Sequence, residues 1–584
     1  LPAACTMPCE APPGAVRRSI MLATFTGYDW LIVVAYIIVG TLPGFLLRRY
    51  IRGQAEFLVA GRSLSIFLAT ATLTATELGL ITVMYFAQAG FLQGFSAFTI
   101  GLIALTCTLF VGLTGFLVAG FRASGVTTFA EYYEKRYCRG VRLLGGLILA
   151  AAGILNYGVF LRIEAEFVRL LTNIPDMVLS SQATGPGAWS IEIPSLRFAM
   201  VVLVLLVLGY TLLGGMVSVV VTDYIQFIVL TLGMGITTWL VLTDHTTGGF
   251  AGLVDAVQKT RPGYGMHPLE TVSKGRLVFG LGGVFVAWQI LHWTASSCWQ
   301  TSAFRTAAAD STKTARAMWS LTAINYFGRA VVPMLWGIAA LAFFFHRGDD
   351  LAKMDSLQAM PSYLATILPA GVSGLLLAGM LAAMMSTHSG YLLSWSGVLT
   401  EDLLCPVLRT CGISLGDRTR LWITRFFILC LAAYLLYFGL WYEVKSNVWN
   451  FLALTGTMYF AGAATLLAFG LYWKRANVGG AFTGLICGAA PGLFAIVTYI
   501  IALSVEREIT NPEHVPVGLA ARISDHLSEP VIGLISYPLG VVGMIVGSLM
   551  YERMRGGSAV ETPVAPGDTP LANMSAGADP EDAQ

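Results

Sequence analysis

The chain has 584 residues, of which 56% are hydrophobic and only 12% are charged. A soluble protein of this size carries about a quarter charged residues, so this composition excludes an ordinary soluble fold. It predicts instead a polytopic protein whose main partner is the lipid bilayer. The net charge of +2 and the lack of a basic block argue against a nucleic-acid partner, and nothing indicates an oligomeric state.

Long apolar runs predict thirteen membrane helices, because a bilayer core of about 30 Å needs about 20 apolar residues per helix. The predicted helices lie near 27–48, 63–88, 94–121, 141–171, 196–216, 218–242, 277–300, 316–345, 361–400, 419–441, 447–472, 478–504 and 529–551. We therefore expect an all-α polytopic membrane protein. Its transmembrane domain covers 27–551, with an extracellular tail at 1–26 and a disordered cytoplasmic tail at 552–584.

Lys and Arg are unevenly distributed between the two sets of loops. Segments such as 48–62 and 122–142 are rich in Arg, and they fall on the same side of the predicted membrane. Because such loops remain in the cytoplasm, the pattern favours an outside N-terminus and a cytoplasmic C-terminus, in the plasma membrane of a bacterium. Residues 126–138 are predicted to form a short amphipathic helix at the inner surface.

The second predicted helix contains four threonines, a glycine and an acid between Ala71 and Thr82. Glu77 in mid-membrane costs about 2.5–3.5 kcal/mol, so it needs a partner or a wet cavity. One interpretation is an unwound segment whose carbonyl oxygens coordinate a cation. The other is a continuous helix in which the threonine hydroxyls bond to their own backbone.

The stretch 374–402 could cross a bilayer, yet small and hydroxyl-bearing residues share one of its faces. With 3.6 residues per turn, that face contains Ala383, Ser386, Thr387, Gly390 and Ser394. Such a face either lets another helix approach closely or supplies hydroxyls that replace the water around an ion. Together with freed carbonyls, it offers about five neutral oxygen ligands, which suit Na⁺ better than Ca²⁺ or Mg²⁺.

Glu77 is a candidate for contact with a solute, and so are aromatic and charged residues in three further helices. Trp288, His292 and Trp299 fall on one side of the helix at 277–300, although core packing explains them equally simply. Arg162 either pairs with Glu166 on its own helix or binds Glu77 or a solute carboxylate. Arg329 is open to the same alternatives.

Several segments, in order and with consistent spacing, resemble the sodium:solute symporter family, which includes proline, pantothenate and sugar/sodium symporters. The similar segments are Asp29-Trp30, Glu56–Arg62, Tyr210–Gly215 with Thr222–Gln226, Gln300 with Arg305, and Ala382–Ser389. The resemblance covers roughly residues 27–475.

The resemblance implies a leucine-transporter-type fold with two inverted five-helix repeats, at about 63–242 and 277–472. It implies sodium coordination by the backbone oxygens of Ala75, Leu78 and Ala383 and by the hydroxyls of Ser386 and Thr387. Asp223 matches an inward-facing acid involved in sodium binding or release. Glu77 stands where some members have an acid and others a neutral residue.

We therefore predict a sodium-coupled symporter that imports a small organic solute by alternating access, with the sodium ion as its only cofactor. Arg162 and Arg329 within predicted membrane helices favour an amino acid or another small carboxylate as the solute. The helix at 277–300 lacks the aromatic and Asn pattern of the sugar-transporting members of the family, which argues against a sugar. No enzymatic activity is expected, because the seven histidines are dispersed along the chain. Two alternatives remain open at this point: a proton-coupled transporter with Glu77 as the carrier, and a membrane sensor of the same fold that does not transport.

Overall fold

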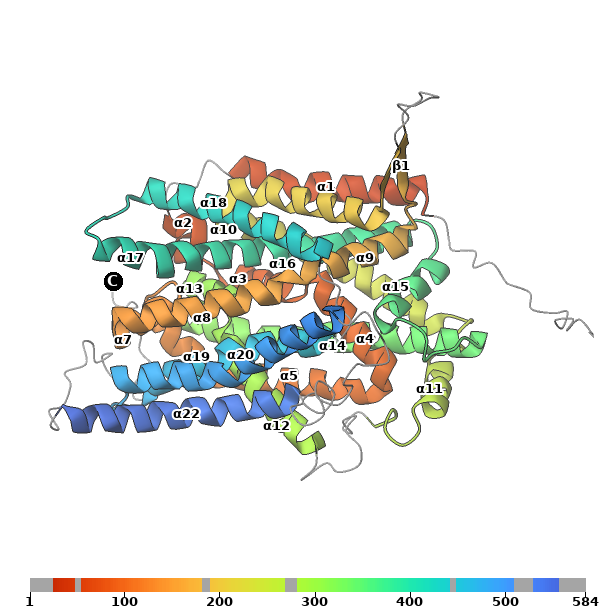
Figure 1. The fold of residues 1–584 in the computed structure, drawn as a ribbon. Coiled ribbons are helices and arrows are strands. Elements are labelled where there is room, and N and C mark those ends of the chain that lie inside the picture. Colours follow the sequence, from red (N-terminus) through yellow and green to blue (C-terminus); the bar gives the residue numbers. More distant parts are fainter. Residues whose placement is uncertain are drawn as a thin grey trace, which may run out of the picture.

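A computed structural model describes residues 25–47, 54–180, 190–267, 281–441, 448–508 and 529–555. Most of both predicted tails lies outside these ranges. The described chain is almost entirely helical, and most of its long helices run along a common direction (Figure 1).

The helices have the following bounds: α1 Gly27–Leu47, α2 Gln54–Val59, α3 Ile66–Glu77, α4 Leu80–Gln93, α5 Phe98–Thr114, α6 Val118–Ala123, α7 Phe129–Arg136, α8 Arg139–Gly158, α9 Phe160–Thr172, α10 Ser195–Thr243, α11 Gly249–Thr260, α12 Leu281–Ala295, α13 Gln300–Ala308, α14 Thr312–Arg347, α15 Ser356–Ile367, α16 Val372–Val398, α17 Cys405–Thr410, α18 Asp417–Trp441, α19 Val448–Tyr472, α20 Val478–Glu508 and α22 Glu529–Met554. One antiparallel hairpin, of β1 (Met177–Ser180) and β2 (Ser190–Ile193), departs from the all-α prediction.

Ten helices in the described part of the chain are long and apolar enough to cross a membrane, so the predicted count of thirteen is not confirmed. The predicted helix at 361–400 is wrong at its start, because α15 ends at Ile367 and α16 begins only at Val372. Between them, Pro369 cannot donate a helical hydrogen bond, and Gly371 has a positive φ of 86°. The predicted helices at 196–216 and 218–242 are confirmed as two spans, Ser195–Leu212 and Ser218–Thr243, which α10 joins through a non-helical Gly215 (φ 49°, ψ −162°).

The loops predicted for opposite sides of the membrane lie at opposite ends of the bundle. Helices α2, α7 and α17 lie at one end, and α11, α15 and the hairpin lie at the other (Figure 1). The predicted inner-surface helix at 126–138 corresponds to α7, whose first turn is capped by the Thr128 hydroxyl at 3.0 Å from the Glu131 amide. Which of these two ends faces the cytoplasm stays a prediction.

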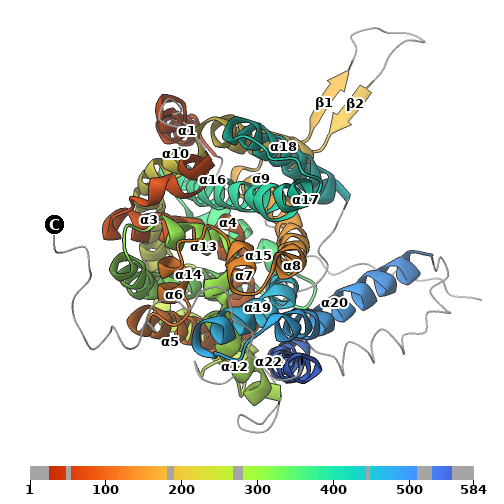
Figure 2. The ribbon, with the colours of Figure 1, turned by 90° about the vertical axis from the view of Figure 1, so that its left-hand side faces the viewer.

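Helix α16 lies inside the bundle, and α1, α5, α18 and α22 surround the central helices in the end view (Figure 2). Helix α16 continues without interruption to Thr410, and we call residues 399–410 the α16 extension. In the most apolar stretch of Val372–Thr410, 89% of the residues are buried, against 33% in that of α18. Glycines allow the central backbones to touch: a Cβ at Gly90 would lie 2.0 Å from the Met334 carbonyl, and one at Gly337 would lie 1.9 Å from that of Ala87. Close approach of this kind is how helices gain dispersion energy in lipid.

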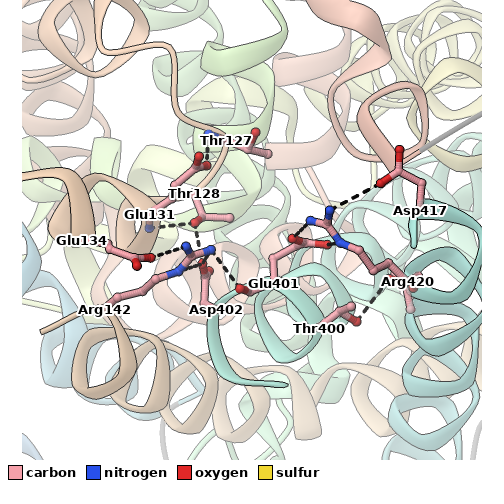
Figure 3. Close-up of polar contacts among 11 residues, drawn as sticks. Thr127, Thr128, Glu131, Glu134, Arg142, Thr400, Glu401, Asp402, Asp417 and Arg420 are labelled. Carbon is pink, nitrogen blue, oxygen red and sulfur yellow. Dashed lines mark hydrogen bonds and ion pairs between the residues drawn. The ribbon is translucent and has the colours of Figure 1, made fainter. Parts of the chain in front are cut away.

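Ion pairs join the helix ends near α7, in a group that we call the inner-end network (Figure 3). Arg142 binds Asp402 at 2.9 Å and Glu134 at 2.5 Å, and the Thr128 hydroxyl donates to Asp402 at 2.8 Å. Arg420 binds Glu401, the residue that precedes Asp402 in the chain. These contacts connect α7 and α8 to the α16 extension and to the start of α18.

Candidate functional site

The second predicted membrane helix is broken in its middle. Helix α3 ends at Glu77, Leu78 has non-helical angles (φ −101°, ψ 71°), and Gly79 is extended (φ −79°, ψ 160°) before α4 begins. The interpretation of a continuous helix is therefore wrong, and that of an unwound segment is confirmed. Gly79 lowers the cost of the break, because glycine has the lowest helix propensity of all residues except proline.

A helix end leaves its last four carbonyl oxygens without helical donors. At the end of α3, the Leu78 amide bonds to the Thr74 oxygen at 3.1 Å, and the Thr387 hydroxyl donates to the Thr76 oxygen at 2.9 Å. Arg329 donates to the Glu77 oxygen. That leaves the Ala75 carbonyl, a predicted sodium ligand, as the one for which the described part of the chain supplies no donor.

The hydroxyl face of α16 packs directly against this break. The Ser386 and Thr76 hydroxyl oxygens are 3.3 Å apart, and a Cβ at Gly79 would lie 2.6 Å from the Thr387 hydroxyl oxygen. Ala75, Leu78 and Ala383 are buried as well. The structure thus brings together the two segments that were expected to share a sodium ion, while their coordination of sodium stays a prediction.

Asp223 of α10 lies beside this pair of segments and is completely buried. Its carboxylate accepts hydrogen bonds from Ser386 at 2.6 Å and from Thr72 at 2.5 Å. The Arg305 guanidinium of α13 is 3.6 Å away, so a positive charge already faces this carboxylate. Asp223 is therefore bonded directly to one predicted sodium ligand, and it connects α3, α10, α13 and α16.

A cavity of about 110 Å³ also adjoins the break. It is lined by Thr76, Glu77, Ile81, Thr82, Tyr85, Asn156, Phe160, His292, Trp293, Ser296, Trp299, Arg329, Thr387, Tyr391, Trp449, Leu452, Ala453, Gly456 and Phe460. A concave, largely aromatic space with a few polar groups is typical of a small-molecule site.

Of the predicted solute contacts, Glu77, His292 and Trp299 line this cavity, whereas Trp288 and Arg162 do not. Trp288 packs so closely against α22 that a Cβ at Gly533 would lie 2.1 Å from its Nε1. Arg162 donates to the Gly439 carbonyl of α18 at 3.0 Å. The roles of all five residues in binding a solute stay predictions.

Glu77 has a partner on α14, as its position in mid-membrane requires. Arg329 Nη1 is 3.2 Å from Glu77 Oε2, and the Ser302 hydroxyl of α13 donates to Oε1 at 2.8 Å. The guanidinium lies over the Tyr326 ring, with its central carbon 3.7 Å from the ring centroid. The pair therefore joins the broken helix to α13 and α14 at the wall of the cavity.

Sequence reasoning missed two features of the site. Trp293 and Trp449 form an aromatic wall with nearly parallel rings, 6.0 Å between centroids; they are 156 positions apart in the sequence, so no local pattern links them. Glu164 lies 2.5 Å from His388 Nε2, and the Tyr157 hydroxyl bonds to the other ring nitrogen at 2.7 Å. This buried group adjoins Thr387 in the sequence and connects α8, α9 and α16.

Comparison with known proteins decides the family. The family model for the sodium:solute symporter family matches residues 57–488. The chain belongs to this family. Membership confirms the predicted resemblance, a multi-pass membrane transporter, sodium as the coupling ion and a small solute as the cargo. It also agrees with the prediction that the chain is not an enzyme.

Individual relatives are distant. The chain is 22% identical to sodium/proline symporter 2 of Staphylococcus saprophyticus over 505 residues, covering 85% of the chain and 91% of the relative. It is 25% identical to sodium-coupled monocarboxylate transporter 2 of Danio rerio over 421 residues, which are 70% of the chain and 61% of that protein.

A solved structure of a Na⁺-coupled sialic acid symporter in an outward-open state resembles the chain with a TM-score of 0.70. The two are 18% identical, and the match covers 90% of this chain and 98% of the other. At this identity the likeness shows the fold alone, and it confirms the predicted leucine-transporter-type architecture.

Proposed function

We propose that this chain imports a small organic carboxylate, such as an amino acid or a simple organic acid, together with sodium by alternating access. The observation that carries the proposal is the break between α3 and α4, which adjoins both the hydroxyls of α16 and the cavity, with Thr387 belonging to both. The relatives named for proline and for monocarboxylates agree with this solute class.

The sodium ion would bind the carbonyl oxygens of Ala75, Leu78 and Ala383 and the hydroxyls of Ser386 and Thr387. The residues fit such an ion in two respects. The Ala75 carbonyl lacks a donor among the described residues. Both hydroxyls donate their hydrogens elsewhere, and the Ser386 oxygen accepts at most one bond, from Thr76, so each keeps a lone pair for a cation. Oxygen ligands of this hard, neutral kind match Na⁺.

Asp223 would receive the ion as it leaves. It shares Ser386 with the proposed site and also bonds to Thr72, six residues before the break on the side of α3 that leads toward α7. With that end in the cytoplasm, as the distribution of Lys and Arg predicts, the path leads inward. Each sodium ion moved through 100 mV releases about 2.3 kcal/mol, enough for a roughly fifty-fold accumulation of a zwitterionic amino acid, which has no net charge. A monoanion that moves with one sodium ion carries no net charge across the membrane, so the sodium concentration gradient alone drives it.

Uptake into proteoliposomes tests this function. We expect L-proline or butanoate to accumulate when an inward sodium gradient is imposed, and not when potassium replaces sodium at the same ionic strength. Undiminished uptake of L-proline in sodium-free buffer under a pH gradient, above that of protein-free liposomes, would overturn the sodium coupling and support Glu77 as a proton carrier. Sodium-dependent stabilisation of the purified protein against heat, with neither solute taken up, would retain the ion site and overturn the solute class.

A further inference from the structure

The Arg329 guanidinium is buried beside the cavity, yet only part of its hydrogen-bonding capacity is used. Its residue is 4% exposed and lies midway along α14. Both hydrogen bonds found for it, to the side chain and to the carbonyl of Glu77, come from Nη1. Its Nε is buried with no hydrogen-bond partner among the described residues. An orphaned charged donor costs more than an ordinary unmade hydrogen bond, so this one calls for a ligand.

The guanidinium plane is held in a fixed orientation. One face lies over the Tyr326 ring at 3.7 Å, and the Trp293 ring centroid is 5.5 Å from the same carbon. Glu77 fixes the Nη1 corner. The edge formed by Nε and Nη2, which we call the free edge, presents two parallel N–H donors, the arrangement that a carboxylate matches with both oxygens.

We propose that Arg329 is the specificity-determining residue and that the solute is a small monoanionic carboxylate bound by this free edge. The inference rests on the function proposed above and narrows it to an anion. Glu77 is the one carboxylate among the lining residues, and it already accepts from Arg329, Ser302 and, at 3.5 Å, Thr301. A solute ammonium group would therefore find no unoccupied carboxylate there.

Charge balance leads to the same solute. Glu77 and Arg329 neutralise each other, and so do Asp223 and Arg305 beside the proposed sodium ligands. With the His388–Glu164 pair counted as neutral, the cavity and its neighbouring sodium ion would carry one uncompensated positive charge. A charge buried in a low-dielectric interior is costly unless it is paired. A monoanion completes the balance, whereas a zwitterion does not. The organic part of the solute would contact the aromatic walls formed by Trp293, Trp449 and Phe460.

Three molecules that differ in one group test the inference: butanoate, butanamide and 2-aminobutanoate. Binding is measured as the shift of the unfolding temperature of the purified full-length protein in sodium, and repeated in potassium. In sodium we expect butanoate to bind about 10- to 100-fold more tightly than butanamide, the range of hydrogen bonds to a charged group, and more tightly than 2-aminobutanoate. Tighter binding of 2-aminobutanoate, or equal binding of butanoate and butanamide, would overturn the inference.

Variants show whether Arg329 is responsible. The double variant Glu77→Gln with Arg329→Gln removes both charges together, and Arg329→Lys keeps the charge but loses the planar fork. We expect the first to bind butanoate and butanamide equally and the second to lose most of the discrimination. The matched control, Arg142→Gln with Asp402→Asn in the inner-end network, removes another buried pair and should keep it.

The outcomes separate this inference from the proposed function. If sodium alone still stabilises the protein while butanoate has no effect, the sodium site stands and the anionic solute is wrong. If the double variant fails to fold, the lysine variant decides: full discrimination in Arg329→Lys would refute a role for the free edge.

Discussion

Removing the two hydroxyls of α16 tests the sodium site most directly. Ser386 donates to Asp223 at 2.6 Å and Thr387 donates to the Thr76 carbonyl at 2.9 Å, so both are fixed toward the break. Hydrogen bonds to charged groups contribute about 1.5–3 kcal/mol, and an oxygen ligand to sodium is of the same order. Each hydroxyl is therefore worth about 10- to 150-fold in sodium affinity, because 1.4 kcal/mol corresponds to a factor of ten. For Ser386→Ala with Thr387→Val we expect a loss of more than about 100-fold.

The measurement is the unfolding temperature of the purified protein as sodium replaces potassium at constant ionic strength. The same titration separates stability from binding. Ser386→Ala deprives Asp223 of one donor, so it lowers the unfolding temperature without sodium as well. Thr387→Val leaves a carbonyl unbonded but keeps the volume of the side chain. Thr387→Ser keeps the hydroxyl and should retain sodium affinity within a few-fold.

Ser396→Ala is the matched control, because Ser396 is also buried on α16, but within the described ranges its hydroxyl bonds only to the Leu393 carbonyl of its own helix. It should leave the sodium titration unchanged. If Ser386→Ala with Thr387→Val bound sodium as well as Ser396→Ala does, the hydroxyl face would serve helix packing, and the sodium assignment would be refuted.

Three further perturbations follow from the same contacts. Gly79→Ala places a Cβ 2.6 Å from the Thr387 hydroxyl oxygen, so we expect a cost of about 1–3 kcal/mol in thermal unfolding and weaker sodium binding; unchanged values would mean that the break is not held against α16. Asp29→Ala removes the carboxylate that accepts from two amides at the start of α16, each at 2.7 Å, and should cost about 1–2 kcal/mol in the same assay, whereas Asp29→Asn should cost less. Hydrogen bonds from Ser195 lower the pKa of Asp176 below its ordinary 3.8. The stability that these bonds contribute is complete above pH 3.8 and is lost as the pH falls through the pKa of the folded protein. An Asp176→Asn variant should therefore lack this part of the loss of stability between about pH 5 and pH 2 in acid unfolding.

Composition and local pattern predicted much of the fold because membrane helices are specified locally. In lipid, a long apolar run must form its backbone hydrogen bonds within itself, so it becomes a helix whose length and position can be predicted from the sequence. The same reasoning failed at 361–400, where continuous hydrophobicity concealed the turn at Pro369 and Gly371. Here the backbone breakers outweighed the apolar pattern. The hairpin of β1 and β2 lies in a loop, where hydropathy gives no signal.

The candidate site was predictable where its chemistry is unusual for a membrane helix. Threonines and an acid around Glu77, and hydroxyls in the middle of α16, contradict the surrounding apolar pattern, and the structure brings them together. The partners of these residues were less accessible. Pairs such as Trp293 with Trp449, or Glu164 with His388, depend on how distant helices cross, and one sequence contains no record of those crossings.

The position of the break explains how two ligands could depend on each other. Thr76 and Glu77 are consecutive residues at the end of α3. The carbonyl of Thr76 accepts from Thr387, itself a proposed sodium ligand, and the side chain of Glu77 bonds to Arg329 at the cavity. A sodium ion that orders this unwound turn also fixes Glu77, and with it the orientation of Arg329. The solute then binds a site that the sodium ion has already ordered, so its binding loses less conformational entropy. The result is positive cooperativity between two neighbouring sites. Thermodynamic linkage makes the effect reciprocal, so the solute must raise sodium affinity by the same factor by which sodium raises solute affinity. Breaking the pair with Glu77→Gln and Arg329→Gln should therefore reduce both factors equally, even though neither residue is a proposed sodium ligand.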